Sequence, residues 1–274
     1  MIQDIYPHKL DNHYYPARKA DAGSIVIVIK ENEVLVKGDL FPTVGEIGAD
    51  AEELIYLFAL DEDQFFLKNV AGNEEFQVPE GYEFINIRSF RRSQTARKHK
   101  VFLAYTALQL SRWYSNNTYC GRCGKKTYLA DNERAIRCEC GNVIYPRVVP
   151  AVIVGVTNGD KILVTKYRTG FEHFALIAGF TEIGETLEET VAREVMEEAG
   201  LRVKNIRYYK SQPWGIVDDI LVGFYCDVDG DDTVRMDEGE LKVAEWRSRE
   251  DIELQPDDYS LTNEMMKMFK EGKT

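Results

Sequence analysis

The chain has 274 residues, enough for about two domains with sizeable cores at roughly 150 residues per domain. Its 34 basic and 46 acidic residues give a net charge of −12. This charge argues against wholesale coating of nucleic acid or anionic membranes, so a polyanionic substrate must be met locally, by a few cations or a metal. The first residues show no cationic stretch followed by an apolar run, and no uncharged run approaches the ~20 residues of a membrane helix. We therefore expect a soluble, cytoplasmic protein with no membrane partner.

The first third of the chain alternates apolar runs with short polar breaks. Residues 24–30 and 33–37 are typical of two strands joined as a hairpin, and further β-like runs follow at 54–60, 65–67 and 84–87. These runs predict an α+β domain over residues 1–92. A stretch without glycine or proline comes next, with apolar residues at helical intervals at Ala96, Leu103, Ala107 and Leu110. It predicts a connecting helix over residues 93–116.

Four of the five cysteines form two tight pairs within residues 117–147, namely Cys120, Cys123, Cys138 and Cys140. Four thiolates at such spacing suit a tetrahedral zinc ion, and because they fill its coordination sphere the metal would be structural. The alternative is four reduced, unrelated thiols. The fifth cysteine, Cys226, lies in an apolar run and is expected to be buried in a strand.

Residues 148–274 alternate strand-like and helix-like stretches, ending in an amphipathic helix over about 259–270, and form the second large domain. Within them, Thr186 and Glu189 have the spacing of a capping box and Gly200 that of a helix stop, which predicts a helix of about four turns. We expect one apolar stripe on this helix, made by Ala192, Val195, Met196 and Ala199. A different face would carry three carboxylates, from Glu194, Glu197 and Glu198.

Three carboxylates crowded on one helix face repel one another, so a compensating charge is expected. Oxygen ligands at this density suit Mg²⁺ or Mn²⁺, which bind through carboxylates, waters and substrate phosphates. The alternative is an ordinary acidic face in contact with solvent. Gly179 and Gly184 precede the helix and allow a tight loop to bring backbone close to the carboxylates, which favours the metal.

Residues 179–201 resemble the Nudix box, GX5EX7REUXEEXGU, where U is aliphatic. Every defined position matches, at Gly179, Glu185, Arg193, Glu194, Val195, Glu197, Glu198, Gly200 and Leu201. The resemblance implies an α/β/α sandwich with a mixed sheet that binds divalent metal and cleaves a nucleoside diphosphate linked to another group. It further implies that Glu194, Glu198 and often Glu197 are metal ligands, while Glu185 and Arg193 brace the loop and the helix.

The order of an N-terminal domain, a zinc ribbon and a Nudix domain is similar to that of the NADH pyrophosphatases. Three local matches support this resemblance, at Tyr145–Arg147, Ser211–Trp214 and Glu240–Trp246. The family splits NAD(H) into nicotinamide mononucleotide and AMP, and some members remove NAD caps from RNA. The resemblance therefore implies NAD(H) or NAD-capped RNA as substrate, Mg²⁺ or Mn²⁺ and Zn²⁺ as cofactors, and a homodimer.

The same resemblance assigns further site residues. Glu240 would be a metal-binding and catalytic carboxylate outside the box, beside Glu194, Glu197 and Glu198, and the backbone carbonyl of Ala178 would complete the metal shell. Substrate contacts would come from Glu133, Tyr145, Phe180, Gln212, Pro213, Trp214 and Asp219. Residues alone leave alternatives open: Phe180 and Trp214 can be core aromatics, and Glu133 can be a surface carboxylate.

Two departures from the family pattern are present, of which the first bears on the substrate and the second on zinc binding. The family string SQPWPFPxS reads here Ser211-Gln-Pro-Trp-Gly-Ile-Val-Asp-Asp219, which replaces a rigid position by Gly215 and adds two carboxylates. The second cysteine pair has one intervening residue in place of the usual two. NAD(H) hydrolysis therefore competes with two other hypotheses: hydrolysis of ADP-ribose or another nucleoside diphosphate derivative, and a non-catalytic sensor of nucleotides or RNA.

Overall fold

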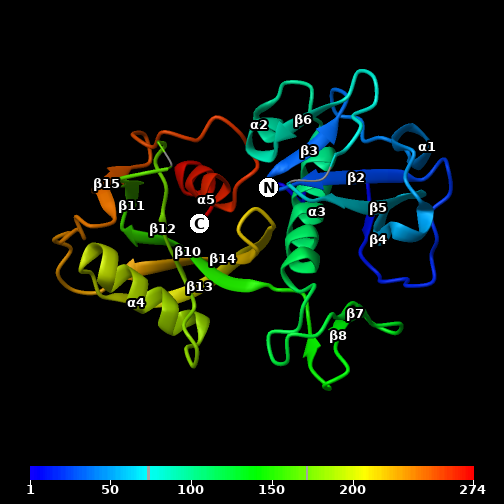
Figure 1. Ribbon diagram of the computed structural model, residues 1–274. Coiled ribbons are helices and arrows are strands. Elements are labelled where there is room, and N and C mark those ends of the chain that lie inside the picture. Colours follow the sequence, from blue (N-terminus) through cyan, green and yellow to red (C-terminus); the bar gives the residue numbers. More distant parts are fainter. Residues whose placement is uncertain (73–74, 171) are drawn as a thin grey trace. The chain divides into compact units, whose positions relative to one another are not determined.

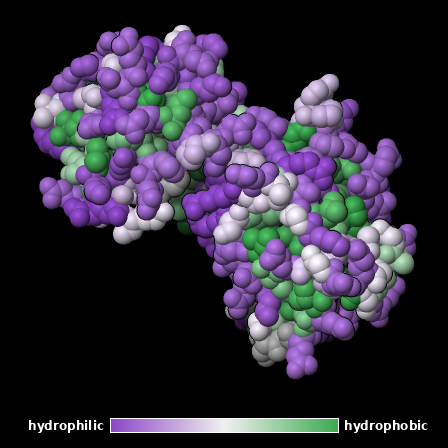
Figure 2. Space-filling view, turned by 90° about the horizontal axis from the view of Figure 1, so that it is seen from above, coloured by the Kyte–Doolittle hydropathy of each residue, from purple (hydrophilic) through white to green (hydrophobic). Residues whose placement is uncertain are grey.

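The computed structural model describes residues 1–72, 75–170 and 172–274 (Figure 1). The chain forms two compact units, of which one contains Met1–Ile2, Val148–Trp214 and Asp219–Thr274, and the other Gln3–Arg147 and Gly215–Asp218. No helix in the described ranges has both the length and the apolar content needed to cross a membrane. Hydrophilic side chains cover most of the face drawn in Figure 2, and hydrophobic ones form smaller patches between them.

The N-terminal unit is built on a mixed six-stranded sheet in the order β1-β4-β5-β2-β3-β6. Its strands are β1 (Leu10–Asp11), β2 (Ile25–Lys30), β3 (Glu33–Val36), β4 (Ile55–Leu60), β5 (Asp63–Val70) and β6 (Glu83–Asn86). The predicted hairpin is the antiparallel pair β2–β3, while β2 and β5 run parallel. Short helical segments lie between the strands, at α1 (Val44–Ile47) and the 3-10 turn Ala51–Glu53.

Two helices follow the sheet in place of the single helix expected over residues 93–116. Helix α2 (Ile87–Arg92) ends at Ser93, and α3 begins only after Arg97 and runs over Lys98–Asn116. The four apolar residues expected to face a core are all buried, at Ala96, Leu103, Ala107 and Leu110. Periodicity thus located the helix, although Ala96 precedes it and α3 is buried on most of its faces. Its start lies a turn later because Ser93 and Arg97 both have extended backbone angles.

The cysteine segment forms a small antiparallel sheet of three short strands in the order β7-β8-β9. These strands are β7 (Tyr128–Leu129), β8 (Ile136–Arg137) and β9 (Val143–Ile144). So few residues bury little apolar surface, and a fold of this size depends on another source of stability, such as a structural metal.

The C-terminal unit is an α/β/α sandwich, which confirms the fold expected for this part. Its sheet has the order β13-β14-β10-β11-β15, with β12 paired to β10. The pair β10–β14 is parallel and the other pairs are antiparallel, so the sheet is mixed. The strands are β10 (Val149–Asn158), β11 (Lys161–Tyr167), β12 (Ile177–Phe180), β13 (Val203–Trp214), β14 (Asp219–Val228) and β15 (Leu241–Ser248).

The two helices of this unit contribute to separate hydrophobic cores. Along β10, Val152, Val154 and Val156 belong to the core of α4 (Leu187–Ala199). Ile153 belongs to the core of α5 (Leu261–Lys270). Successive strand residues point to opposite faces, so this run of apolar residues is expected where a strand is covered on both sides.

Candidate active site

Helix α4 begins and ends as expected, but its buried side differs from the prediction. Thr186 and Glu189 form the capping box, and Gly200 adopts the left-handed conformation that ends the helix. The apolar stripe was wrong in part, because Ala192 and Met196 are exposed. The buried side is made by Val191, Val195 and Ala199 together with two carboxylates, Glu194 and Glu198. Because β12 covers this edge of the helix, these two carboxylates are not on a solvent face.

Three of the predicted metal-binding carboxylates lie close together, although they come from two elements. Glu194 and Glu198 project from α4 and are 9% and 3% exposed, while Glu240 is exposed just before β15. The pKa of Glu198 is raised to about 8. Burial is the largest cause, and the neighbouring charges of Glu194 and Glu240 act in the same direction. Burial likewise raises the pKa of Glu194. Such crowding of like charges is stable only with a compensating cation or proton.

The carboxylate of Glu198 has the hydrogen-bonding deficit expected of a metal ligand. It accepts a hydrogen bond from the backbone N–H of Ala178. Its second oxygen, Oε2, is buried and has no hydrogen-bond partner among the described residues. An ionised oxygen in this position is costly unless a cation contacts it, and carboxylate oxygens are what Mg²⁺ and Mn²⁺ prefer. The chemistry of these residues fits a divalent metal, which Glu194, Glu198 and Glu240 would hold, whereas among the described residues only the four cysteines of the ribbon have their ligand atoms within 4.8 Å of one another.

Gly179 in β12 makes room for the carboxylate of Glu194. A Cβ at this position would lie 1.9 Å from the Cδ atom of Glu194 and 2.1 Å from its Oε1 atom. No side chain can occupy that space, so the carboxylate lies directly against the backbone of β12. The first glycine of the box thus has a steric role in the structure.

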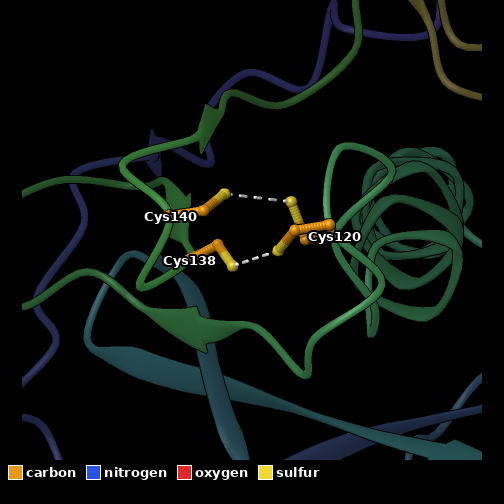
Figure 3. A group of neighbouring side chains, drawn as sticks. Cys120, Cys138 and Cys140 are labelled. Carbon is orange, nitrogen blue, oxygen red and sulfur yellow. Dashed lines mark hydrogen bonds between the residues drawn. The ribbon is translucent and has the colours of Figure 1, made fainter.

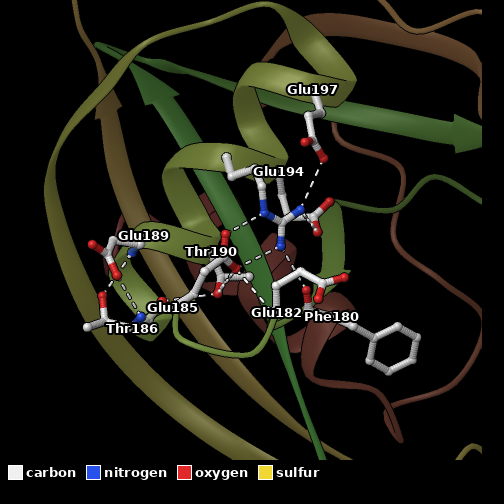
Figure 4. Close-up of polar contacts among 9 residues, drawn as sticks. Phe180, Glu182, Glu185, Thr186, Glu189, Thr190, Glu194 and Glu197 are labelled. Carbon is white, nitrogen blue, oxygen red and sulfur yellow. Dashed lines mark hydrogen bonds and ion pairs between the residues drawn. The ribbon is translucent and has the colours of Figure 1, made fainter.

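Arg193 joins the loop to the helix through several carboxylates (Figure 4). Its Nε and Nη2 atoms donate to the two oxygens of Glu185 at 2.6 and 2.9 Å, a bidentate pair. Its Nη1 atom donates to Glu194 at 2.6 Å and to Glu197 at 3.0 Å, and Nη2 also reaches the carbonyl of Phe180 at 2.9 Å. Hydrogen bonds from Arg193 lower the pKa of Glu185 to about 2. The guanidinium group therefore fixes the carboxylates and β12 in one arrangement.

The four cysteines of the ribbon converge on one point (Figure 3). The Sγ atoms of Cys120 and Cys140 are 3.7 Å apart, those of Cys123 and Cys138 are 3.5 Å apart, and all four lie within 4.8 Å of one another. A tetrahedron with Zn–S bonds of about 2.3 Å has sulfur atoms about 3.8 Å apart. The single-residue spacing of the second pair thus still brings both sulfurs to the centre. The cluster fits structural Zn²⁺.

Among the predicted substrate residues, those of the Nudix unit differ in exposure. The ring of Phe180 is 53% exposed and points away from the carboxylates of Glu185, Glu194 and Glu197 (Figure 4), which suits stacking on a ligand. Gln212 is fully buried, and its amide donates to the carbonyl of Tyr259 and accepts from the N–H of Leu261 at 2.7 Å each. This side chain supports the start of α5, which argues against direct substrate contact.

The remaining predicted contacts stay predictions. Trp214 and Asp219 face each other where β13 ends and β14 begins, and Asp219 is 4% exposed. Pro213 precedes them and is exposed. Glu133 and Tyr145 belong to the ribbon, where Glu133 accepts from Arg137 at 2.8 Å and Tyr145 is 59% exposed.

Residues 215–218, which depart from the family string, pack on α3. A Cβ on Gly215 would lie 2.3 Å from the carbonyl oxygen of Tyr105, so only glycine fits. Arg112 of α3 donates to the carbonyl of Ile216 at 2.8 Å and lies 3.7 Å from a carboxylate oxygen of Asp218. The added glycine and the first added carboxylate thus have structural partners.

Two residues near the carboxylates escaped the sequence reasoning. Tyr167 ends β11 and lies opposite Leu241, next to Glu240; burial and the charges of Glu198 and Glu240 raise its pKa. Arg168 donates its backbone N–H to the carbonyl of Glu240 at 3.0 Å and its Nε to the carbonyl of Glu238. These two residues come close to Glu240 through the pairing of β11 with β15, and no local pattern in the sequence predicts that pairing.

Comparison with known families agrees with this geometry. Residues 146–269 match the NUDIX domain, and residues 115–145 match the NADH pyrophosphatase zinc ribbon domain. The chain therefore contains a Nudix domain, preceded by a zinc ribbon domain that matches the NADH pyrophosphatase type.

Among characterised relatives, the chain is similar to the NAD-capped RNA hydrolase NudC of Escherichia coli (strain K12 / DH10B) and to that of Shigella boydii serotype 18. Each is 41% identical over 158 residues, which cover 56% of this chain and 60% of the relative. The match thus spans about 60% of these relatives' length. A solved NUDIX hydrolase from Nitrosomonas europaea has 21% identity and a TM-score of 0.49, covering 56% of this chain and 91% of the other.

Proposed function

We propose that the chain is a metal-dependent hydrolase of the diphosphate bond of NAD(H), giving nicotinamide mononucleotide and AMP, and that it also removes NAD caps from RNA. The observation that carries the proposal is the buried Glu198 carboxylate, whose Oε2 atom has no partner among the described residues, beside Glu194 and Glu240. The relatives' name, NAD-capped RNA hydrolase, supports the choice of substrate. We also propose a homodimer, on the resemblance to the NADH pyrophosphatases alone, and a cytoplasmic location.

Hydrolysis forms a bond between a water oxygen and one phosphorus, and the bridging oxygen leaves with the other phosphate. Bound divalent cations would neutralise the charge that develops on the diphosphate and would lower the pKa of a bound water. Glu194, Glu198 and Glu240 would hold these cations, while Arg193 keeps Glu194 and the carbonyl of Phe180 in place. The exposed ring of Phe180 would stack on a base or on the nicotinamide.

The chain's own segment at 215–219 favours a second candidate, hydrolysis of ADP-ribose or another nucleoside diphosphate derivative. This segment replaces the family's prolines and phenylalanine and adds Asp218 and Asp219. The non-catalytic sensor is less well supported, because Glu194, Glu197, Glu198 and Glu240 are all present. Loss of any of these carboxylates would have favoured it.

The test is to incubate the protein with Mg²⁺ or Mn²⁺ and NADH, NAD⁺, ADP-ribose, diadenosine polyphosphates or NAD-capped RNA, and to identify products by mass. We expect AMP and reduced nicotinamide mononucleotide, with NADH turned over fastest among the free nucleotides. Faster turnover of ADP-ribose would select the second candidate, and no turnover of any compound would select the sensor.

Glu198→Gln tests the metal assignment. Because it removes a charged ligand, we expect kcat to fall by at least ~10²-fold, the scale typical of losing one group that stabilises transition-state charge. Glu188→Gln is the matched control, since Glu188 is an exposed carboxylate on the same helix. Circular dichroism should show that both variants are folded. Full activity in Glu198→Gln would show that the metal assignment is wrong.

A further inference from the structure

The zinc ribbon differs in charge from the rest of the chain. Residues 117–147 contain six basic and three acidic residues, a net charge of +3, while the other residues carry −15. A zinc ion with four thiolates would add −2 and leave the ribbon at +1. The ribbon is therefore less acidic than the chain as a whole, as is the segment 88–100 with its six basic and no acidic residues, and a polyanion would meet less repulsion there than the net charge of −12 suggests.

One face of the small sheet carries an aromatic side chain beside a cation. Tyr128 of β7 lies directly opposite Arg137 of β8, which lies opposite Val143 of β9, so the three side chains share a face. Tyr128 is 53% exposed. Arg137 is held by Glu133 at 2.8 Å, and its buried Nε atom has no acceptor among the described residues.

A hollow of about 510 Å³ opens at this face, within the usual range for small-ligand sites. It is lined by Tyr128, Arg137 and the loop that joins β7 to β8, which contributes Asp131 and Asn132. The hollow thus combines an aromatic surface, a guanidinium group, an amide and a carboxylate. A nucleotide presents the matching groups: a base that stacks, donors and acceptors on its edge, and a phosphate.

We propose that this face of the ribbon binds single-stranded RNA, with a base stacked on Tyr128, the base edge against Asn132 and Asp131, and a backbone phosphate near Arg137. Stacking on exposed aromatics beside basic residues is how proteins hold single strands, whose bases are free to leave the helix. An acidic peptide would leave the aromatic ring unused, and a duplex would keep its bases stacked internally.

This surface lies on the ribbon and adds a contact for the RNA body to the cleavage proposed above. The inference rests on the proposed function in one respect: that function gives the reason to expect RNA as a ligand. Its test uses neither a cap nor a divalent metal, so RNA binding can fail while NADH is still hydrolysed, or succeed while it is not.

The experiment titrates the full, zinc-loaded chain into a 3′-fluorescein-labelled 12-nucleotide uncapped RNA without secondary structure, and follows fluorescence anisotropy. We expect micromolar binding that weakens as salt rises. Tyr128→Ala should raise Kd about 5- to 10-fold, the scale of one lost stacking contact, and Tyr128→Phe should restore it. Tyr119→Ala is the matched control, because Tyr119 is another exposed tyrosine of the ribbon, at 65%, and does not line the hollow.

Zinc content, measured with a colorimetric chelator, should be the same in all four proteins and shows that the ribbon stays folded. Three results would overturn the proposal: no binding by the unaltered chain, Tyr128→Ala binding as tightly as the unaltered chain, or Tyr119→Ala weakening binding as much as Tyr128→Ala. A fourth result would also overturn it. If light scattering gives a lower molecular mass for Tyr128→Ala than for the unaltered chain and the other variants, this face joins two copies of the chain.

Discussion

At the scale of single residues, the candidate active site depends on the absence of a side chain at Gly179 as much as on its carboxylates. Replacing Gly179 by alanine would place a methyl group 1.9 Å from the Cδ atom of Glu194. Because Arg193 and α4 hold Glu194 from the other side, the carboxylate cannot stay in place. We expect Gly179→Ala to lower kcat by at least ~10²-fold, as loss of a charge-stabilising group does. Steady-state kinetics with NADH and Mg²⁺ measures the loss.

The control is Gly121→Ala, because a Cβ there meets no atom within 4 Å and the backbone is not left-handed. It should keep full activity. Isothermal titration with Mn²⁺ separates the two possible causes of inactivity in Gly179→Ala. Weaker Mn²⁺ binding with an unchanged melting temperature supports the displaced carboxylate, whereas unaltered binding and turnover would refute it.

At the scale of elements, α4 shows what a sequence can and cannot reveal. The cap at Thr186 and the stop at Gly200 are local signals, and both hold in the structure. The buried side was misjudged because Glu194 and Glu198 are polar by type but are covered by β12, a strand that reaches the helix only through tertiary packing. The same limit hid Tyr167, whose closeness to Glu240 depends on the pairing of β11 and β15.

The segment after Trp214 was the other point that sequence comparison left open. In the sequence, Gly215 stands where the family string has a rigid proline, and in the structure it is the residue that lets its segment approach α3, against the carbonyl of Tyr105. That requirement depends on a contact between residues 110 positions apart in the chain. A close backbone approach of this kind leaves no periodic pattern in the sequence.

Gly215 therefore offers a prediction about stability. Gly215→Ala would bring Cβ to 2.3 Å from a backbone oxygen of α3, which has no flexible side chain to move aside. We expect a cost of about 1–3 kcal/mol, as for other overpacked sites, and a melting temperature lower by about 2–4 °C per kcal/mol. Differential scanning calorimetry measures it.

Val217→Ala is the control, because Val217 is 44% exposed in the same segment. It should change the melting temperature little. If Gly215→Ala has the same melting temperature as the unaltered chain, the backbone at residue 215 does not lie close to the carbonyl of Tyr105 in solution.

At the scale of the whole molecule, the acidic composition is distributed unevenly. Part of the negative charge lies in Glu194, Glu198 and Glu240, where a cation would convert repulsion into binding. The ribbon has the opposite sign, so the chain's net charge of −12 describes neither region. Net charge predicts that the protein does not coat a polyanion along its length, and it says nothing of the local sites, which depend on spacing and on the structure.

The response of the whole fold to acid can be predicted from one buried histidine. His99 lies in the first turn of α3, 9% exposed, with the ring of His8 4.1 Å away. The pKa of His99 is lowered to about 4, mainly by burial. The positive charges of His8, Lys100 and Arg97 also lower it, and the negative charge of Asp39 raises it. A lowered folded-state pKa gives stability that is present above pH 6.5, the ordinary value, and is lost as pH falls towards 4.

We therefore expect His99→Phe, which keeps a ring but cannot take up a proton, to lose less melting temperature than the unaltered chain between pH 7.5 and 4.5. The exposed His13→Phe is the control and should follow the unaltered chain, because His13 lies on the surface. Glu198 acts in the opposite direction, since its raised pKa favours the protonated, folded form in acid, but it is common to all three proteins and cancels in the comparison. If the melting temperatures of His99→Phe and the unaltered chain fall equally between pH 7.5 and 4.5, protonation of His99 costs no stability. Acid would then unfold this protein through other groups.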